Sequence, residues 1–158
     1  MNRELNLTQK ERMLLEDQKS HEEVCIQKYL SFASQASDPQ LQQLFRNYAN
    51  QEQQHLDTIN QILNGQIPNV SQSSQSMQST PQLNPQSNHP SFQNKDDAEL
   101  CKDLLMTEKY VSGTYDTAIF EFEDSNIRQI LNHIQKEEQQ HGEGIFNYMK
   151  AHGMYPTT

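Results

Sequence analysis

The sequence has few cysteines, few basic residues and no long apolar run, and each shortage excludes a class of protein. Its two cysteines, Cys25 and Cys101, form neither a metal-ligand spacing nor a disulfide framework. Lys and Arg number 12 against 21 Asp and Glu, so the formal net charge is −9 at pH 7. This charge argues against binding to nucleic acid or to an anionic membrane surface. No apolar run approaches the roughly 20 residues of a membrane span, so we expect no membrane insertion.

The N-terminus also lacks the features of a secretory signal. Its first residues, MNRELNLTQKER, contain no apolar segment of the kind that such signals need. We therefore expect synthesis in the cytoplasm without a signal peptide. In that reducing environment, Cys25 and Cys101 are expected as buried thiols rather than as a disulfide.

The apolar content is low for a compact chain of 158 residues, at 33% with a mean hydropathy of −0.95. The stretch from Gln66 to Asn94 accounts for this, because it contains no Asp, Glu, Lys or Arg and consists almost entirely of Ser, Gln, Asn and Pro. Such a composition cannot bury enough apolar surface to offset the entropy of ordering the chain. We therefore predict a polar linker over residues 66–95.

Start and stop signals on either side of this linker predict four long helices. Thr8 and Glu11 form a capping box, and Asp38 followed by Pro39 is a strong helix start. No period-two alternation indicates a strand. The expected helices cover about 8–35, 39–64, 96–122 and 126–152, in a first hairpin over 8–65 and a second hairpin over 96–153. We predict that residues 1–158 form one all-α four-helix bundle.

The two hairpins align with each other without a gap at an offset of 86 positions. The tetrapeptide Glu-Gln-Gln-His occurs at 52–55 and again at 138–141, and Glu22 corresponds to Glu108. An ancestral duplication of one hairpin is the simple account of this internal repeat. Duplication alone does not explain why several of the shared letters are polar residues on the predicted buried face.

Each predicted helix carries one carboxylate in the middle of its core-facing seam, where a bundle normally places Leu or Ile. The seams of the second and fourth helices are Leu41, Phe45, Tyr48, Glu52, His55, Ile59, Ile62 and Ile127, Leu131, Ile134, Glu138, His141, Ile145, Tyr148. Those of the first and third are Leu15, Gln18, Glu22, Cys25, Tyr29, Phe32, Ala36 and Cys101, Leu104, Glu108, Val111, Tyr115, Ala118, Phe122. Two of the four seams therefore add a histidine three residues after the glutamate.

These polar seam residues have the composition of a dinuclear metal site. Four carboxylates buried at one level without partners would cost several kcal/mol each, whereas two divalent cations would match their charge. Glu-x-x-His presents an oxygen and a nitrogen ligand on one helix face, and this ligand set is that of ferritin-like di-iron and di-manganese proteins. The predicted metal ligands are Glu22, Glu52, His55, Glu108, Glu138 and His141. Iron and manganese are the expected metals, zinc accepts the same ligands, and no catalytic residue is assigned.

Other interpretations stay open. A Glu-x-x-His pair is commonly a solvated pair on a helix surface, and a duplicated bundle could keep an inherited polar layer that holds water or internal hydrogen bonds. Tyr29 and Tyr115, two turns beyond the seam glutamates, are either hydrogen-bond donors to the ligands or core aromatics. Gly142 and Gly144 allow either close packing or a solvent path to the site. The remaining histidines of the helices, His21, His133 and His152, are expected at the surface.

Two segments of the second hairpin, DLLMTEKYVSGTYDTAIFEFEDSNIRQIL and IFNYMKAHGMYP, carry a resemblance to a known family. Over about residues 97–156 the chain resembles the spore coat protein F family of endospore-forming bacteria, and its first hairpin resembles the N-terminal half of two-hairpin members. The resemblance implies a ferritin-like four-helix fold, a location in the spore coat and other coat proteins as partners. It does not imply metal ligands.

Two functions follow from these observations. The resemblance favours a component of the spore coat, in whose core the polar seam residues predict a dinuclear metal site. The ligand set favours a di-iron or di-manganese oxidoreductase acting on peroxide or O₂, with catalase-like or ferroxidase activity. In the oxidoreductase, Glu52 and Glu138 would bridge the metals, and Glu22, Glu108, His55 and His141 would be terminal ligands. The length of the linker allows an up-down-up-down bundle, but we expect a long crossover between the second and third helices, as in ferritin-like bundles. The sequence leaves open whether the protein is an enzyme and whether it forms a homo-oligomer.

Overall fold

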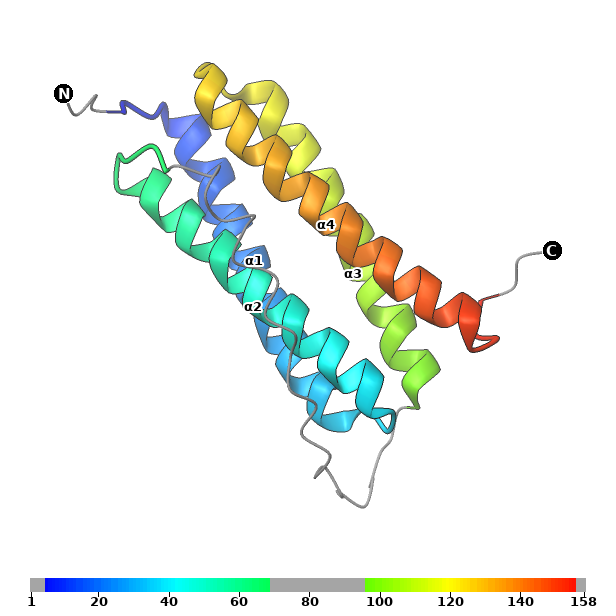
Figure 1. The fold of residues 1–158 in the computed structure, drawn as a ribbon. Helices are drawn as coiled ribbons and strands as arrows, with labels where there is room; N and C mark the ends of the chain where they lie inside the picture. Colours follow the sequence, from blue (N-terminus) through cyan, green and yellow to red (C-terminus); the bar gives the residue numbers. More distant parts are fainter. Residues whose placement is uncertain (1–4, 69–95, 156–158) are drawn as a thin grey trace.

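The computed structural model describes residues 5–68 and 96–155, which contain four long α-helices (Figure 1). The helices are α1 (Gln9–Gln35), α2 (Pro39–Leu63), α3 (Asp97–Glu121) and α4 (Ser125–Ala151). No strand occurs within the described residues, and the prediction of an all-α four-helix bundle with two hairpins is confirmed. Most of the predicted polar linker, residues 69–95, lies outside the described part of the chain.

Side-chain caps begin all four helices. At the start of α1 the N–H of Glu11 donates to Thr8 Oγ1 at 3.0 Å and the N–H of Thr8 donates to Glu11 Oε1 at 2.9 Å, so the predicted capping box is present. Asp38, Asp96 and Asp124 each accept a hydrogen bond of 2.8–2.9 Å from a backbone N–H two or three residues later. These caps satisfy backbone donors that the first turn of a helix leaves without partners.

Glycines end both hairpins. Gly65 and Gly153 follow the C-caps of α2 and α4 with φ angles of 82° and 68°, in the left-handed region that favours glycine. The fourth helix begins at Ser125, one residue earlier than the sequence indicates, because Asp124 accepts from the N–H groups of both Asn126 and Ile127.

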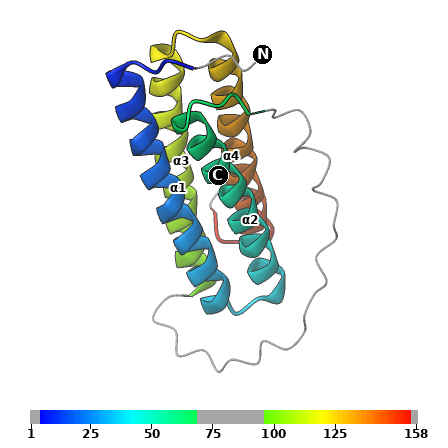
Figure 2. The same ribbon diagram turned by 90° about the vertical axis from the view of Figure 1, so that its left-hand side faces the viewer.

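Hydrogen bonds at the two ends of the bundle define the helix directions. At one end Asp97 accepts from the backbone N–H groups of Ser37 and Asp38 at 2.8 and 3.1 Å, so α2 and α3 begin next to each other. At the other end the N–H of Glu123, just before α4, donates to Glu11 in α1 at 2.9 Å. Helices α2 and α3 are therefore parallel to each other and antiparallel to α1 and α4 (Figure 2). The connection from α2 to α3 joins opposite ends of the bundle, as expected for a crossover.

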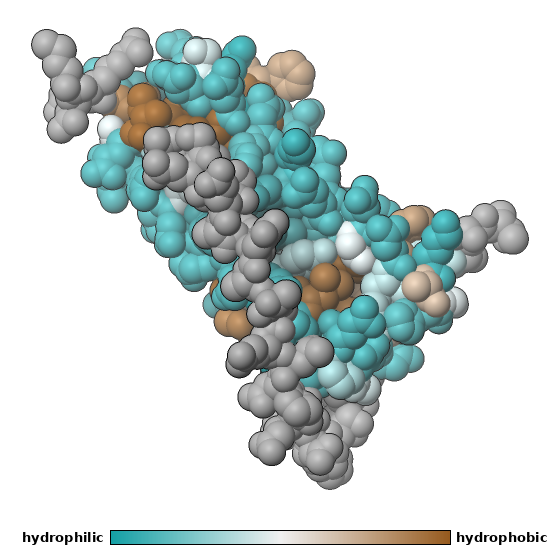
Figure 3. Space-filling model, in the orientation of Figure 1, coloured by the Kyte–Doolittle hydropathy of each residue, from teal (hydrophilic) through white to brown (hydrophobic). Residues whose placement is uncertain are grey.

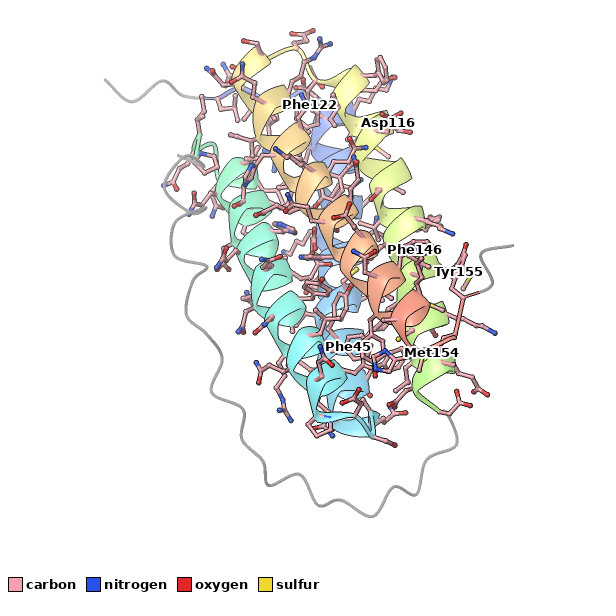
Figure 4. All side chains as sticks on the ribbon, turned by 45° about the vertical axis from the view of Figure 1, so that its right-hand side comes forward. Phe45, Asp116, Phe122, Phe146, Met154 and Tyr155 are labelled. Carbon is pink, nitrogen blue, oxygen red and sulfur yellow. The ribbon has the colours of Figure 1, made fainter. Side chains whose placement is uncertain are left out.

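The core consists of two apolar clusters with a polar layer between them. On α4, Glu138 and His141 lie between the residues that belong to the two clusters. Phe45 and Phe122, one from each cluster, lie toward opposite ends of the bundle (Figure 4). All predicted seam residues are buried except Tyr48, which is half-buried. Apolar burial at both ends drives the helices together and so places the polar layer in the middle.

The outer surface is mostly hydrophilic. Figure 3 shows polar residues over most of one face, with one apolar area between the lower parts of α2 and α4 and another at the upper left, near the N-terminal end of the chain. Within the described residues, no helix combines the length and the apolar character that crossing a membrane would require.

Gly144 allows α4 to approach Tyr48 of α2 closely. A Cβ atom at position 144 would lie 1.9 Å from Tyr48 Oη and 3.1 Å from Tyr48 Cζ. The Tyr48 ring is held between this glycine and the imidazole of His141, on which it stacks with ring centroids 4.2 Å apart. Of the two roles left open for Gly144, the structure supports close packing.

We expect Gly144→Ala to lower the free energy of unfolding by about 1–3 kcal/mol, because the added methyl group displaces the Tyr48 ring. Thermal unfolding followed by circular dichroism measures the effect. Gly142→Ala is the matched control: its Cβ would make an ordinary 3.7 Å contact with Leu105, and we expect up to about 1 kcal/mol of stabilisation. Removing the hydroxyl in Tyr48→Phe/Gly144→Ala should recover part of the loss. An equal loss in the single and double variants would contradict this account.

Candidate metal centre

The six predicted ligands lie together in the middle of the bundle, and every helix contributes. Helices α1 and α3 supply one glutamate each, and α2 and α4 supply a glutamate and a histidine each. All six side chains are buried, with at most 2% of any residue exposed: Glu22, Glu52, His55, Glu108, Glu138 and His141. The seam spacing brings them to one level because each stands at the middle of its helix.

Their ligand atoms fall into two groups of four that share two glutamates. One group is Glu22, Glu52, His55 and Glu138, and the other is Glu52, Glu108, Glu138 and His141. Within each group, one ligand atom per residue lies within 4.8 Å of the others, so that each group could hold a metal ion. The two shared residues, Glu52 and Glu138, are those expected to bridge.

Both imidazoles turn Nδ1 toward the carboxylates. His55 Nδ1 lies 2.8 Å from Glu52 Oε1, 3.5 Å from Glu138 Oε1 and 3.6 Å from Glu22 Oε2. His141 Nδ1 lies 3.2 Å from Glu108 Oε2, 3.4 Å from Glu138 Oε1 and 3.9 Å from Glu52 Oε2. Nδ1 is therefore the nitrogen that each histidine directs into the layer, where it could bind a metal ion.

The outer nitrogens of the same imidazoles bond to two residues that the sequence analysis did not single out. His55 Nε2 lies 2.8 Å from Glu137 Oε1 of α4, and His141 Nε2 bonds to Gln51 Oε1 of α2. An acceptor on one ring nitrogen fixes the tautomer and the orientation of the ring toward the metal. The sequence holds one signal for this pair, since residues 51 and 137 correspond at the repeat offset and both carry an acceptor oxygen directly before the glutamate.

Two tyrosines hydrogen-bond to the glutamates of the opposite hairpin. Tyr115 Oη of α3 donates to Glu22 Oε2 of α1 at 2.5 Å, and Tyr29 Oη of α1 donates to Glu108 Oε2 of α3. Tyr29 and Tyr115 are equivalent in the repeat, and so are Glu22 and Glu108, so each hairpin donates the same kind of hydrogen bond to the other. Of the two roles left open for these tyrosines, the structure therefore supports donors to the glutamate carboxylates, which orient them.

The layer carries more negative charge than its two imidazoles can balance. Burial and the neighbouring carboxylates raise the pKa of Glu52 well above its usual range, and burial and Glu138 raise the pKa of Glu108 to about 7. Burial alone would lower the pKa of His141, but the carboxylates of Glu108 and Glu138 beside its Nδ1 raise it to about 9. Burial would raise the pKa of Glu138, but its contacts with His141 and His55 hold it below its usual range.

Several carboxylate oxygens of the layer have no hydrogen-bond partner among the described residues. They are Glu22 Oε1, Glu52 Oε2, Glu108 Oε1 and both oxygens of Glu138. Buried polar atoms without partners are rare in proteins, and each one calls for an explanation such as a bound ion. Carboxylate oxygens and imidazole nitrogens are ligands that iron, manganese and zinc accept, so the residues present fit a divalent metal ion.

The other candidate side chains lie outside the layer. His152 is exposed as predicted, and His21 and His133 are half-buried, so each keeps part of its ring at the surface. His21 packs edge-on against the ring of Tyr110, and His133 Nε2 lies 3.5 Å from Glu137 Oε1. Tyr110 and Glu137 therefore cover part of the two imidazole rings. Cys25 and Cys101 are free and buried, as predicted.

Fold and layer together define a four-helix bundle with buried carboxylates and histidines at its centre. Comparison with known families adds that residues 96–158 match the coat F domain family. The family resemblance found in the sequence is thereby confirmed.

A curated relative of the chain comes from Bacillus subtilis (strain 168), where it is described as uncharacterized protein YusN. It is 32% identical over 72 residues, which cover 46% of the present chain and 66% of the relative. The chain thus spans about two thirds of the length of this relative. No solved structure matches the chain.

Proposed function

We propose that this protein is a component of the spore coat whose bundle binds a pair of divalent metal ions. The coat F domain at residues 96–158 supports the coat assignment and makes other coat proteins the expected partners. The observation that carries the metal assignment is the buried layer itself. Its four carboxylates converge in two groups that share Glu52 and Glu138, and five of their oxygens have no hydrogen-bond partner among the described residues.

In this proposal the shared glutamates bridge the two ions. Glu22 and His55 complete one ion position, and Glu108 and His141 complete the other. Four carboxylates then match the charge of two divalent ions, which offsets the desolvation of the buried groups. Iron or manganese is the expected pair, and zinc fits the same donors.

A second candidate function is oxidoreductase chemistry on peroxide or O₂, with catalase-like or ferroxidase activity. It is favoured by a hollow of about 560 Å³ whose walls include Glu108 and Glu138, which brings the molecular surface close to the layer. A pair of iron or manganese ions would supply the electrons for such a reaction. The chain's own contribution would be to hold the imidazoles through Glu137 and Gln51 and to exclude bulk water with the apolar clusters.

Metal analysis by plasma mass spectrometry tests the metal assignment. The protein is purified without a His-tag and reconstituted separately with Fe²⁺ and Mn²⁺ in the absence of oxygen. We expect about two equivalents of bound metal in the parent and almost none in Glu52→Ala/Glu138→Ala, because the double variant lacks both shared ligands. No bound metal in the parent, together with a double variant that is at least as stable as the parent, would leave an inherited polar layer as the explanation.

The coat assignment has a separate test. A fluorescent fusion expressed in the sporulating source organism should collect at the spore surface and be recovered in the coat extract. A fusion that stays in the mother-cell cytoplasm until lysis would contradict this assignment without touching the metal proposal.

A further inference from the structure

We propose that the two ion positions are inequivalent: the position at His55 holds a tightly bound, resident ion, and the position at His141 holds an exchangeable ion that a small oxidant or anion reaches from outside. This inference rests on the proposed metal site and deepens it. It follows from two differences between repeat-equivalent residues.

The first difference lies behind the two imidazoles. His55 Nε2 faces the carboxylate of Glu137, whereas His141 Nε2 faces the amide oxygen of Gln51. A carboxylate accepts a charge-assisted hydrogen bond, which makes the imidazole a stronger electron donor to its metal than a neutral amide does. Changes of this kind outside the ligands alter metal affinity by roughly 10–100-fold. The His55 position is therefore the tighter one.

The second difference lies in access to the layer. The hollow of about 560 Å³ between α3 and α4 is lined by Glu108 and Glu138 and by Gly142, the residue that follows His141. Glu108 belongs to the His141 group alone, and Glu138 is shared by both groups. Phe146 and Tyr155 form one wall of the hollow, with their rings 4.9 Å apart next to α3 and α4 (Figure 4). The hollow thus lies beside the His141 position rather than the His55 position.

Gly142 keeps this hollow open. The equivalent residue of the first hairpin is Leu56, so a large side chain is compatible with this place in the repeat. A Cβ on Gly142 would meet Leu105 Cδ1 at 3.7 Å, an ordinary contact, so local packing does not demand a glycine. A glycine in the middle of a helix disfavours the helix relative to alanine. Gly142 stands at the wall of the hollow, and the absence of a side chain there leaves room for a molecule of a few atoms to enter.

Calorimetric titration of the metal-free full chain with Mn²⁺ tests the first half of the proposal. We expect two binding events whose Kd values differ by roughly 10–100-fold. Glu137→Gln should weaken the tighter event by about that factor and bring the two together, and Gln51→Glu should strengthen the weaker event. His141→Ala should keep the tighter event, and His55→Ala should remove it. The inference would be overturned if the parent showed two binding events with equal Kd values and Glu137→Gln left both Kd values unchanged.

Azide binding to the protein loaded with Co²⁺, followed by the visible spectrum, tests the second half. We expect Gly142→Leu to weaken azide binding at least about tenfold while two equivalents of metal remain, and Gly142→Ala to have a smaller effect, since the leucine side chain extends into the hollow. Unchanged azide affinity in Gly142→Leu would overturn the assignment of the entry. A parent that binds no metal overturns the proposed function itself, whereas two ions of equal affinity overturn only this inference.

Discussion

Replacement of Glu52 by glutamine is expected to stabilise the metal-free protein by about 1–3 kcal/mol and to abolish most of the stabilisation that metal ions provide. Burial and three neighbouring carboxylates raise the pKa of Glu52 well above its usual range, so its charged form opposes folding when no ion is present. A neutral amide of the same shape removes this repulsion. With ions bound, the same carboxylate is a shared ligand, and its loss weakens both positions.

Thermal unfolding at about pH 7.5, in chelator and in excess Mn²⁺, measures both effects. Two ions, each at about 100 times its Kd, stabilise the parent by about 5 kcal/mol, which corresponds to a rise in Tm of roughly 10–20 °C for a chain of this size. Most of that rise should be missing in Glu52→Gln. The exposed Glu143 on α4 provides the matched control, since Glu143→Gln should change neither state. A Glu52→Gln variant that is destabilised with and without metal would show a structural role in place of a ligand role.

The metal-free protein is expected to lose stability as the pH rises through about 7, and the metal-loaded protein is not. Burial and Glu138 raise the pKa of Glu108 from 4.5 in the unfolded chain to about 7 in the folded one. Its contribution to stability is therefore complete below about pH 4.5 and is lost as the pH passes about 7. Glu108 alone contributes on the order of 3 kcal/mol, which corresponds to a fall in Tm of roughly 6–12 °C.

The other groups of the layer do not reverse this trend at neutral pH. The pKa of His141 is raised to about 9, so its contribution also disappears as the pH rises, at a higher pH. The pKa of Glu138 is lowered, so its contribution is lost only in acid. Metal ions displace the protons of the layer and bind more tightly as the pH rises. The Tm of the loaded protein should accordingly stay level or rise over the same range.

Tm values from about pH 5 to pH 9, with and without Mn²⁺, test this prediction. Glu108→Gln is the matched variant, because it removes the carboxylate whose pKa is raised to about 7 and should flatten the profile of the metal-free protein near neutral pH. Parallel profiles for the metal-free and metal-loaded protein would contradict the prediction, since they would show that metal and protons do not compete for the same carboxylates.

Local sequence signals determined where the helices begin and end. The capping box at Thr8 and the aspartates at positions 38, 96 and 124 bond to backbone groups within three residues, so their effect does not depend on the rest of the fold. Helical spacing in the same way determined which side chains enter the core. Glu22, Glu108 and both Glu-Gln-Gln-His segments were found because residues three and four apart share a face.

Only the tertiary structure decided what those side chains touch. Gln51 and Glu137 each hydrogen-bond to a histidine of the opposite hairpin. Tyr29 and Tyr115 each hydrogen-bond to a glutamate of the opposite hairpin. Periodicity within one helix leaves its rotation and stagger against the next helix free, and contacts across helices depend on both. The same limit applies to the hollow beside Gly142. A sequence repeat shows that two halves correspond. Only packing decides which half has a hollow beside its glutamates, because the walls of the hollow come from different helices and from the chain after α4.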